Sequence, residues 1–163
     1  MVSEQQGKSS LESMINAIAL EEQSLVLPEF DQKIALDLGL AVLRKARQKQ
    51  VAVTIDIRRG DHILFHYSMP GTGPNNDRWV ERKSNTVQLI QKSSYRVGLE
   101  LALKGDTLEN RQALDPAKYA SHGGSFPIRV KGAGLIGALT VSGLPQEEDH
   151  ALVVETLKEY LGE

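Results

Sequence analysis

Residues 122–149 read HGGSFPIRVKGAGLIGALTVSGLPQEED, and this stretch decides the fold. It holds two short apolar runs, Phe126–Val130 and Leu135–Val141, on either side of the turn Lys131–Gly134. Short apolar runs joined by a glycine-bearing turn predict a β-hairpin. Gly143 ends the second run. Glu147, Glu148 and Asp149 lie in the first turn of the helix that follows, where negative charge interacts favourably with the helix dipole. We expect the rest of the chain to pack around this hairpin.

A second hairpin and a short strand are predicted upstream. Residues Val51–Ile57 alternate between large apolar and small or polar side chains and are rich in β-branched residues, which predicts a strand. A turn at Arg58–Asp61 and a second, antiparallel strand at His62–Tyr67 complete the hairpin. The apolar run Ser24–Leu27 is stopped by Pro28, which indicates a short edge strand.

Helices fill the intervals between these strands. Helical spacing of apolar residues predicts them at about residues 9–23, 31–50, 77–93, 95–104 and 145–161. Ser9 or Ser10 is the expected N-cap of the first helix, and Asp31 that of the second. Residues 107–121 are expected to be irregular or weakly helical. Hairpins with helices between them indicate an α+β fold rather than a doubly wound parallel sheet.

The composition is that of a globular protein. Of 163 residues, 40% are hydrophobic and 25% are charged. We expect a single domain over residues 9–163, preceded by a flexible arm over residues 1–8.

A net charge of −2 argues against a nucleic-acid partner. The absence of cysteine excludes disulfides, thiolate metal sites and a cysteine nucleophile. Without a signal-peptide core or an apolar run of bilayer length, we expect a cytoplasmic protein with no membrane contact.

His122, Gly123 and Gly124 form the first candidate site. Two glycines after a histidine, just before a buried strand, let backbone amides approach a ligand closely. Successive amides in such a turn form an anion-binding concavity, and the imidazole adds a donor or a metal ligand. The other interpretation is a simple glycine bend at which a loop enters the sheet.

Trp79, Arg82, Lys83 and Thr86 form the second candidate site. Their spacing of three, four and seven places them near one helical face. Basic residues in the first turns of a helix oppose its dipole, so another interaction has to hold them there. One hypothesis is a small anionic ligand bound by Arg82 and Lys83; another is an ion pair across the domain or a subunit contact.

The remaining histidines give weaker signals. His62 and His66 lie an even number of residues apart on one strand, so they share a face and either bind a metal with a third ligand or lie on the hairpin surface. We favour the surface and assign no metal site. His150, beside Asp149, is also expected at the surface. The sequence contains no phosphate-binding loop, His-Glu-x-x-His or Gly-x-Ser-x-Gly motif, so we assign no catalytic residue.

Several spaced motifs together resemble a known group of proteins. They are Leu38–Leu40, Trp79–Val87, Gly124–Ile128, Gly134–Gly137, Val141–Gly143 and Asp149. In this order, over about residues 15–162, the chain resembles the haem-degrading domain superfamily, and within it the branch called uncharacterised protein family 0303. The resemblance implies a profilin-like α/β/α sandwich, with a roughly five-stranded antiparallel sheet flanked by helices. It also implies a homo-oligomer.

Two functional hypotheses follow. The first is a non-enzymatic oligomeric module that binds a small ligand or a protein. The second, implied by the resemblance, is a haem- or iron-binding or haem-degrading protein, with haem as the possible cofactor and His122 as a possible axial ligand.

Overall fold

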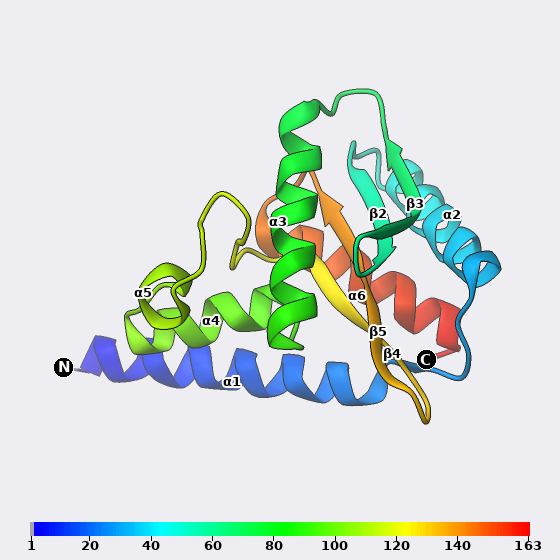
Figure 1. Ribbon diagram of the computed structural model, residues 1–163. Coiled ribbons are helices and arrows are strands. Elements are labelled where there is room, and N and C mark those ends of the chain that lie inside the picture. Colours follow the sequence, from blue (N-terminus) through cyan, green and yellow to red (C-terminus); the bar gives the residue numbers. More distant parts are fainter. Residues whose placement is uncertain (1) are drawn as a thin grey trace.

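Both predicted hairpins form in the computed structural model, which describes residues 2–163 (Figure 1). The first joins β2 (Thr54–Arg59) to β3 (His62–Ser68), and the second joins β4 (Ser125–Val130) to β5 (Gly134–Ser142). With β1 (Val26–Leu27) they make one sheet in the order β1-β4-β5-β2-β3. β5 is therefore the central strand, which confirms that the fold is built around the second hairpin.

One strand pair corrects the expectation of an antiparallel sheet. β1 runs parallel to β4, with Val26 opposite Arg129 and Leu27 opposite Val130. A hairpin turn dictates antiparallel pairing only for the two strands that it joins. β1 and β4 are far apart in the chain, so no local signal sets their direction, and the sheet is mixed.

Six helices surround the sheet within the described residues. They are α1 (Val2–Ser24), α2 (Gln32–Gln48), α3 (Pro74–Ile90), α4 (Ser94–Lys104), α5 (Leu108–Gln112) and α6 (Gln146–Leu161). Asp31 caps α2 as expected, since its side chain accepts a hydrogen bond from the Ile34 amide. Two helices begin earlier than predicted: α1 includes residues 2–8, and α3 begins at Pro74, whose fixed φ suits the first helical turn. None of them, over residues 2–163, combines the length and apolar character that a membrane crossing requires.

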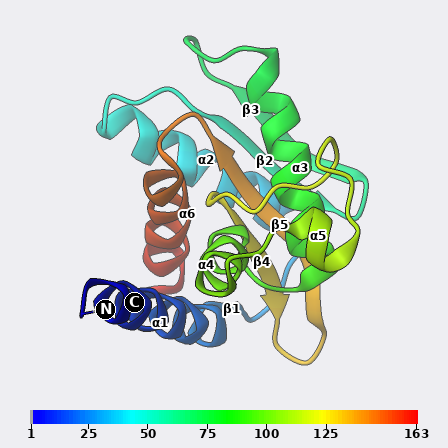
Figure 2. The same ribbon diagram turned by 90° about the vertical axis from the view of Figure 1, so that its left-hand side faces the viewer.

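The helices form layers on both faces of the sheet, which makes an α+β sandwich (Figure 2). α2 and α6 cover one face and bury the main core. The sheet side chains of this core are Ile55, Ile57, Phe126, Ile128, Leu139 and Val141, and they pack with residues of both helices such as Leu38, Val42, Leu152 and Leu157. The strict alternation of these positions along the strands produces the apolar face.

The opposite face, which α3 covers, is polar although it is also buried. Its side chains alternate with those of the core, and we call this set the polar sheet face: Thr54, Asp56, Ser125, Thr140 and Ser142. The hydroxyl groups of Ser125 and Thr140 lie 2.8 Å apart and bond to one another. The sandwich therefore has one apolar and one polar interlayer.

Candidate functional site

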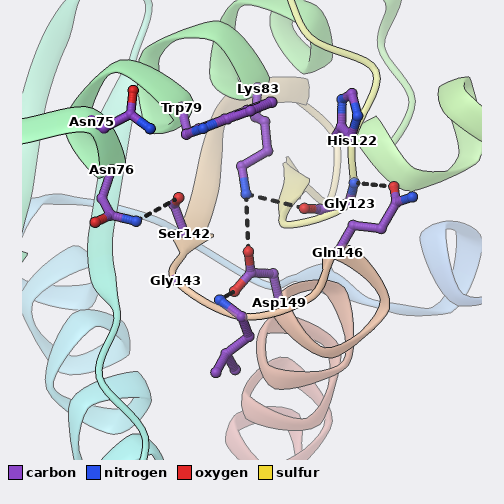
Figure 3. A pocket seen from close by; sticks show the side chains of 11 residues that line it. Asn75, Asn76, Trp79, Lys83, His122, Gly123, Ser142, Gly143, Gln146 and Asp149 are labelled. Atoms are coloured by element: carbon purple, nitrogen blue, oxygen red, sulfur yellow. Dashed lines mark hydrogen bonds and ion pairs between the residues drawn. The ribbon is translucent and has the colours of Figure 1, made fainter. Parts of the chain in front are cut away.

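A pocket of about 330 Å³ lies where the start of α3, the loop before β4 and the β5–α6 connection meet (Figure 3). It is lined by Asn75, Asn76, Trp79, Lys83, His122, Gly123, Ser142, Gly143, Leu144, Gln146 and Asp149. The pocket unites two motifs that are about 40 residues apart in the sequence. Of the predicted site residues, Trp79, Lys83, His122 and Gly123 line it, whereas Arg82, Thr86 and Gly124 do not.

Lys83 lies at the floor of the pocket and is only 2% exposed. Its ammonium group donates to the Gly123 carbonyl at 3.0 Å and the Val141 carbonyl at 2.6 Å. The third contact is Asp149 Oδ2 at 3.3 Å. An ammonium group has three protons, so these partners use all of its donors.

Asp149 completes this arrangement from the first turn of α6. Its second oxygen, Oδ1, accepts a hydrogen bond from the Leu144 amide at 3.0 Å. Burial raises the pKa of Asp149 to about 6, against the opposing attraction of Lys83. Burial likewise lowers the pKa of Lys83, and Asp149 opposes that shift. The helix-start position of Asp149 predicts only an exposed carboxylate, so no local signal in the sequence identifies this pair.

Trp79 forms a wall of the pocket together with His122. The two rings meet edge to face at a centroid distance of 5.1 Å. The Arg82 guanidinium stacks on Trp79, 4.4 Å from the ring centroid, while its Nε donates to the Pro116 carbonyl at 2.9 Å. Burial, and then the positive charges of Arg82 and Lys83, lower the pKa of the His122 imidazole.

Thr86 and Gly124 hold the frame of the site. The Thr86 hydroxyl donates to the Arg82 carbonyl and accepts from the Ala120 amide, both at 3.1 Å, which ties the loop before β4 to α3. Gly124 has a φ of +133°, and its carbonyl accepts from the Val141 amide at 2.8 Å. A side chain there would collide with the Lys83 amine and the Val141 carbonyl.

Besides Asn75 and Asp149, three polar pocket residues were absent from the sequence-based prediction: Asn76, Ser142 and Gln146. Gln146 Oε1 accepts from the Gly123 amide at 3.0 Å, and Asn76 Nδ2 donates to Ser142 Oγ at 3.3 Å. Amide and hydroxyl side chains are common in loops and at helix ends, and these ones form no recognisable motif in the sequence. Only the fold brings these three together.

His66 and His150 occupy settings that the sequence did not indicate. His66 lies between two carboxylates, with Nδ1 2.7 Å from Asp56 Oδ2 and Nε2 2.8 Å from Asp77 Oδ1. No group of three potential metal ligands occurs among residues 2–163. The expectation that His150 is exposed is wrong: it is 6% exposed, with its ring against Tyr95 and Phe126.

Comparisons with known proteins agree with this fold. The family model described as "Haem degrading protein HbpS-like" matches residues 30–158. A UPF0303 protein of Streptomyces avermitilis is 47% identical over 147 residues, which is 90% of each chain. The crystal structure of the Ybr137w protein superimposes with a TM-score of 0.84 and 31% identity, covering 91% of this chain and 87% of that one.

A more distant structural match shows the fold alone. The PduOC:Heme complex has a TM-score of 0.67 at 20% identity, and the match covers 81% of this chain and 94% of that chain. The family match covers well over half of the sequence, and the similarity to the Streptomyces protein extends over 90% of the chain. The chain therefore belongs to the HbpS-like family and, within it, is related to the UPF0303 proteins.

Proposed function

We propose that this protein is a cytoplasmic, non-enzymatic oligomeric module that binds a small ligand in the pocket beside α3. The observation that carries the proposal is the convergence of Trp79, His122 and three polar side chains on one cavity of about 330 Å³. Cavities of this size, with a few placed polar groups, are typical of small-molecule sites. Perturbed pKa values in a cleft often mark catalysis. Here Lys83 and Asp149 bind each other and the backbone, which supports a structural role and a binding function.

A thermal-shift screen of the full chain tests ligand binding. Probes that are neutral, anionic and cationic are added one at a time at millimolar concentration. We expect at least one class to raise the melting temperature, because a ligand at 100 times its Kd adds about 2.7 kcal/mol of stability. The effect should disappear in Trp79→Ala, checked for folding by circular dichroism. No stabilisation by any class would contradict the proposal.

The oligomer is supported by large apolar side chains that remain exposed on the edge strand β3 and on the neighbouring helix α2. They are Ile63 and Tyr67 on β3, and Leu36 and Leu40 on α2. β3 is an outer strand, so its outward backbone groups can pair with a second chain. We expect light scattering at micromolar concentration to give more than a monomer, and Ile63→Lys to lower the mass. Leu20→Lys, on the exposed side of α1, is the control; a monomeric wild type would contradict the proposal.

Haem binding is the second candidate, favoured by the exposed His122 and by the haem complex among the structural matches. The lining does not fit an enclosed porphyrin, since Trp79 and Leu144 are the only large apolar side chains in it. We therefore assign no haem chemistry to the pocket. Absorption titration of the protein with haem decides the matter. A shifted Soret band that disappears in His122→Ala would establish haem binding, and an unshifted band in the wild type would exclude this candidate.

A further inference from the structure

The charges around the pocket restrict which ligand it can bind. We infer that the pocket takes an uncharged ligand with several hydroxyl or amide groups, of the sugar or polyol class. This inference rests on the proposed function, because it names the ligand class of the same site. The sequence suggested an anionic ligand. In the folded protein the pocket groups that remain available for hydrogen bonding are uncharged, so a neutral ligand matches them better.

The first step is that the pocket offers no uncommitted charge. The three protons of Lys83 are used by two carbonyls and Asp149. Asp149 also has both oxygens engaged, since Oδ1 accepts from the Leu144 amide. Arg82 is outside the lining and is held by the Pro116 carbonyl. Burial, and then the positive charges of Arg82 and Lys83, lower the pKa of His122 and favour its neutral form. An ionic ligand would lose its hydration shell here without gaining an opposite charge.

The second step concerns the hydrogen-bonding groups that remain for a ligand. Gln146 uses its Oε1 to hold the Gly123 amide, which turns its NH₂ group to other partners. Ser142 accepts from Asn76 through its oxygen and keeps its hydroxyl proton. The Asn75 amide is exposed at the mouth of the pocket. These are neutral donors and acceptors, and they complement hydroxyl and amide groups.

The third step is the aromatic wall. Figure 3 shows the Trp79 ring edge-on above the Lys83 amine, so one of its faces borders the pocket. Arg82, which is outside the pocket, lies over the ring at 4.4 Å and fixes its orientation. An aromatic face beside amide and hydroxyl groups suits a ligand with one C–H-rich face and a polar rim. Sugars and cyclic polyols have this character.

The experiment uses Trp79, the only tryptophan in the chain, as the reporter. Its fluorescence is measured in the full protein during titration with glucose, myo-inositol and N-acetylglucosamine, and separately with inorganic phosphate and acetate. We expect a saturable change with at least one neutral probe in the millimolar range and none with the anions. Gln146→Ala and Ser142→Ala should each weaken the apparent affinity roughly tenfold, because each loses one hydrogen bond. Gln48→Ala, on the exposed surface of α2, should bind as the wild type does.

The outcomes separate this inference from the proposed function. Saturable binding of phosphate or acetate without binding of a neutral probe would overturn the inference and leave a ligand-binding pocket in place. Neutral-probe binding that is unchanged in both pocket variants would overturn it as well, because the ligand would then lie elsewhere. If no probe of either kind changes the fluorescence, and the broader thermal screen is also negative, the proposed function itself fails.

Discussion

At the scale of single residues, Lys83 determines how three segments meet at the pocket. It extends from α3 and contacts the loop before β4, the C-terminal end of β5 and the start of α6 through Gly123, Val141 and Asp149. A buried ion pair gains little net stability over an apolar pair, but removing one partner costs about 3–5 kcal/mol. The pair therefore acts to specify this one arrangement of the segments.

The raised pKa of Asp149 gives stability a defined pH dependence. Its native pKa of about 6 exceeds the ordinary 3.8, so between these values the folded protein holds a proton that the unfolded chain has released. This contribution is complete below about pH 4 and is lost as the pH rises through 6. We expect the difference in unfolding free energy, wild type minus Asp149→Asn, to fall by up to about 3 kcal/mol between pH 4 and pH 7. Urea denaturation at several pH values measures it; a constant or growing difference would contradict the assignment.

Gly124 is expected to be the least replaceable glycine of the loop. Gly124→Ala would combine a strained positive φ with collisions at Lys83 and Val141. We expect a loss of at least about 3 kcal/mol. Gly132→Ala is the matched control, because Gly132 also has a positive φ but has open space around it, and it should lose only about 1 kcal/mol. Equal losses in thermal or chemical unfolding would refute the role of the close contacts.

Residue type and spacing point to four of the eleven residues that line the pocket: Trp79, Lys83, His122 and Gly123. Basic residues in the first turns of a helix oppose its dipole, and two glycines before a strand let the backbone approach a ligand, so both motifs predict a specific interaction. For Lys83 the structure matches the second hypothesis, an ion pair across the domain, because its buried amine lies 3.3 Å from Asp149 Oδ2. Burial depends on contacts between segments distant in sequence, so Asp149 and His150 could not be placed from their neighbours.

At the scale of elements, His66 connects the outer strand β3 to the helix α3. Its ring nitrogens face Asp56 on β2 and Asp77 in the first turn of α3, and Arg58 forms a bidentate pair with the same Asp56. A neutral imidazole has one N–H and cannot donate to both carboxylates. The bridge is therefore complete only when His66 is protonated.

This bridge leads to a second pH prediction. Burial lowers the pKa of His66, but hydrogen bonds to Asp56 and Asp77 outweigh it, so the net pKa lies above 6.5. The stabilisation is present below pH 6.5 and is lost as the pH rises through the native pKa. In Asp77→Asn we expect the His66 pKa, followed by NMR, to fall, and the stability loss to be below about 1 kcal/mol because Asp77 is half exposed. Asp37→Asn is the control; an unmoved His66 titration would refute the bridge.

Elements themselves were largely predictable, because their signals are local. The two hairpins follow from alternating runs and turn glycines, and α2 from the Asp31 cap. The parallel direction of β1 was not predictable, because it is set by pairing with β4. The early start of α1 was not predictable from an apolar stripe, because residues 2–8 contain no large apolar side chain apart from Val2 and all of them are exposed.

At the scale of the whole molecule, the two interlayers of the sandwich differ in strength. α6 buries Leu152, Val153 and Leu157 in the main core, whereas the buried apolar residues of α3 are Val80 and Val87, and it faces the polar sheet face. Apolar burial contributes most of the free energy that holds a helix to a sheet. The α3 layer should therefore be the more easily opened of the two.

Native-state hydrogen exchange tests this difference. We expect the amides of residues 80–90 in α3 to exchange at least roughly tenfold faster than those of residues 150–157 in α6, because local opening follows buried apolar contact. Saturating the pocket with a ligand should slow exchange in α3 and leave residues 150–157 of α6, which do not line the pocket, unchanged. Equal protection of the two helices would show that the Lys83 pair and the hydroxyl contacts hold α3 as firmly as an apolar core.

The parallel pairing of β1 with β4 also constrains how the protein is made. Val26 and Leu27 pair with Arg129 and Val130, about 100 residues later in the chain. A ribosome adds about 5–20 residues per second, so β1 waits for its partner for about 5–20 s after it has been synthesised. During synthesis Leu25 and Leu27, both buried in the finished core, are without their final neighbours. The apolar side chains of the first strand therefore lack the shelter of the sheet until most of the domain has been synthesised.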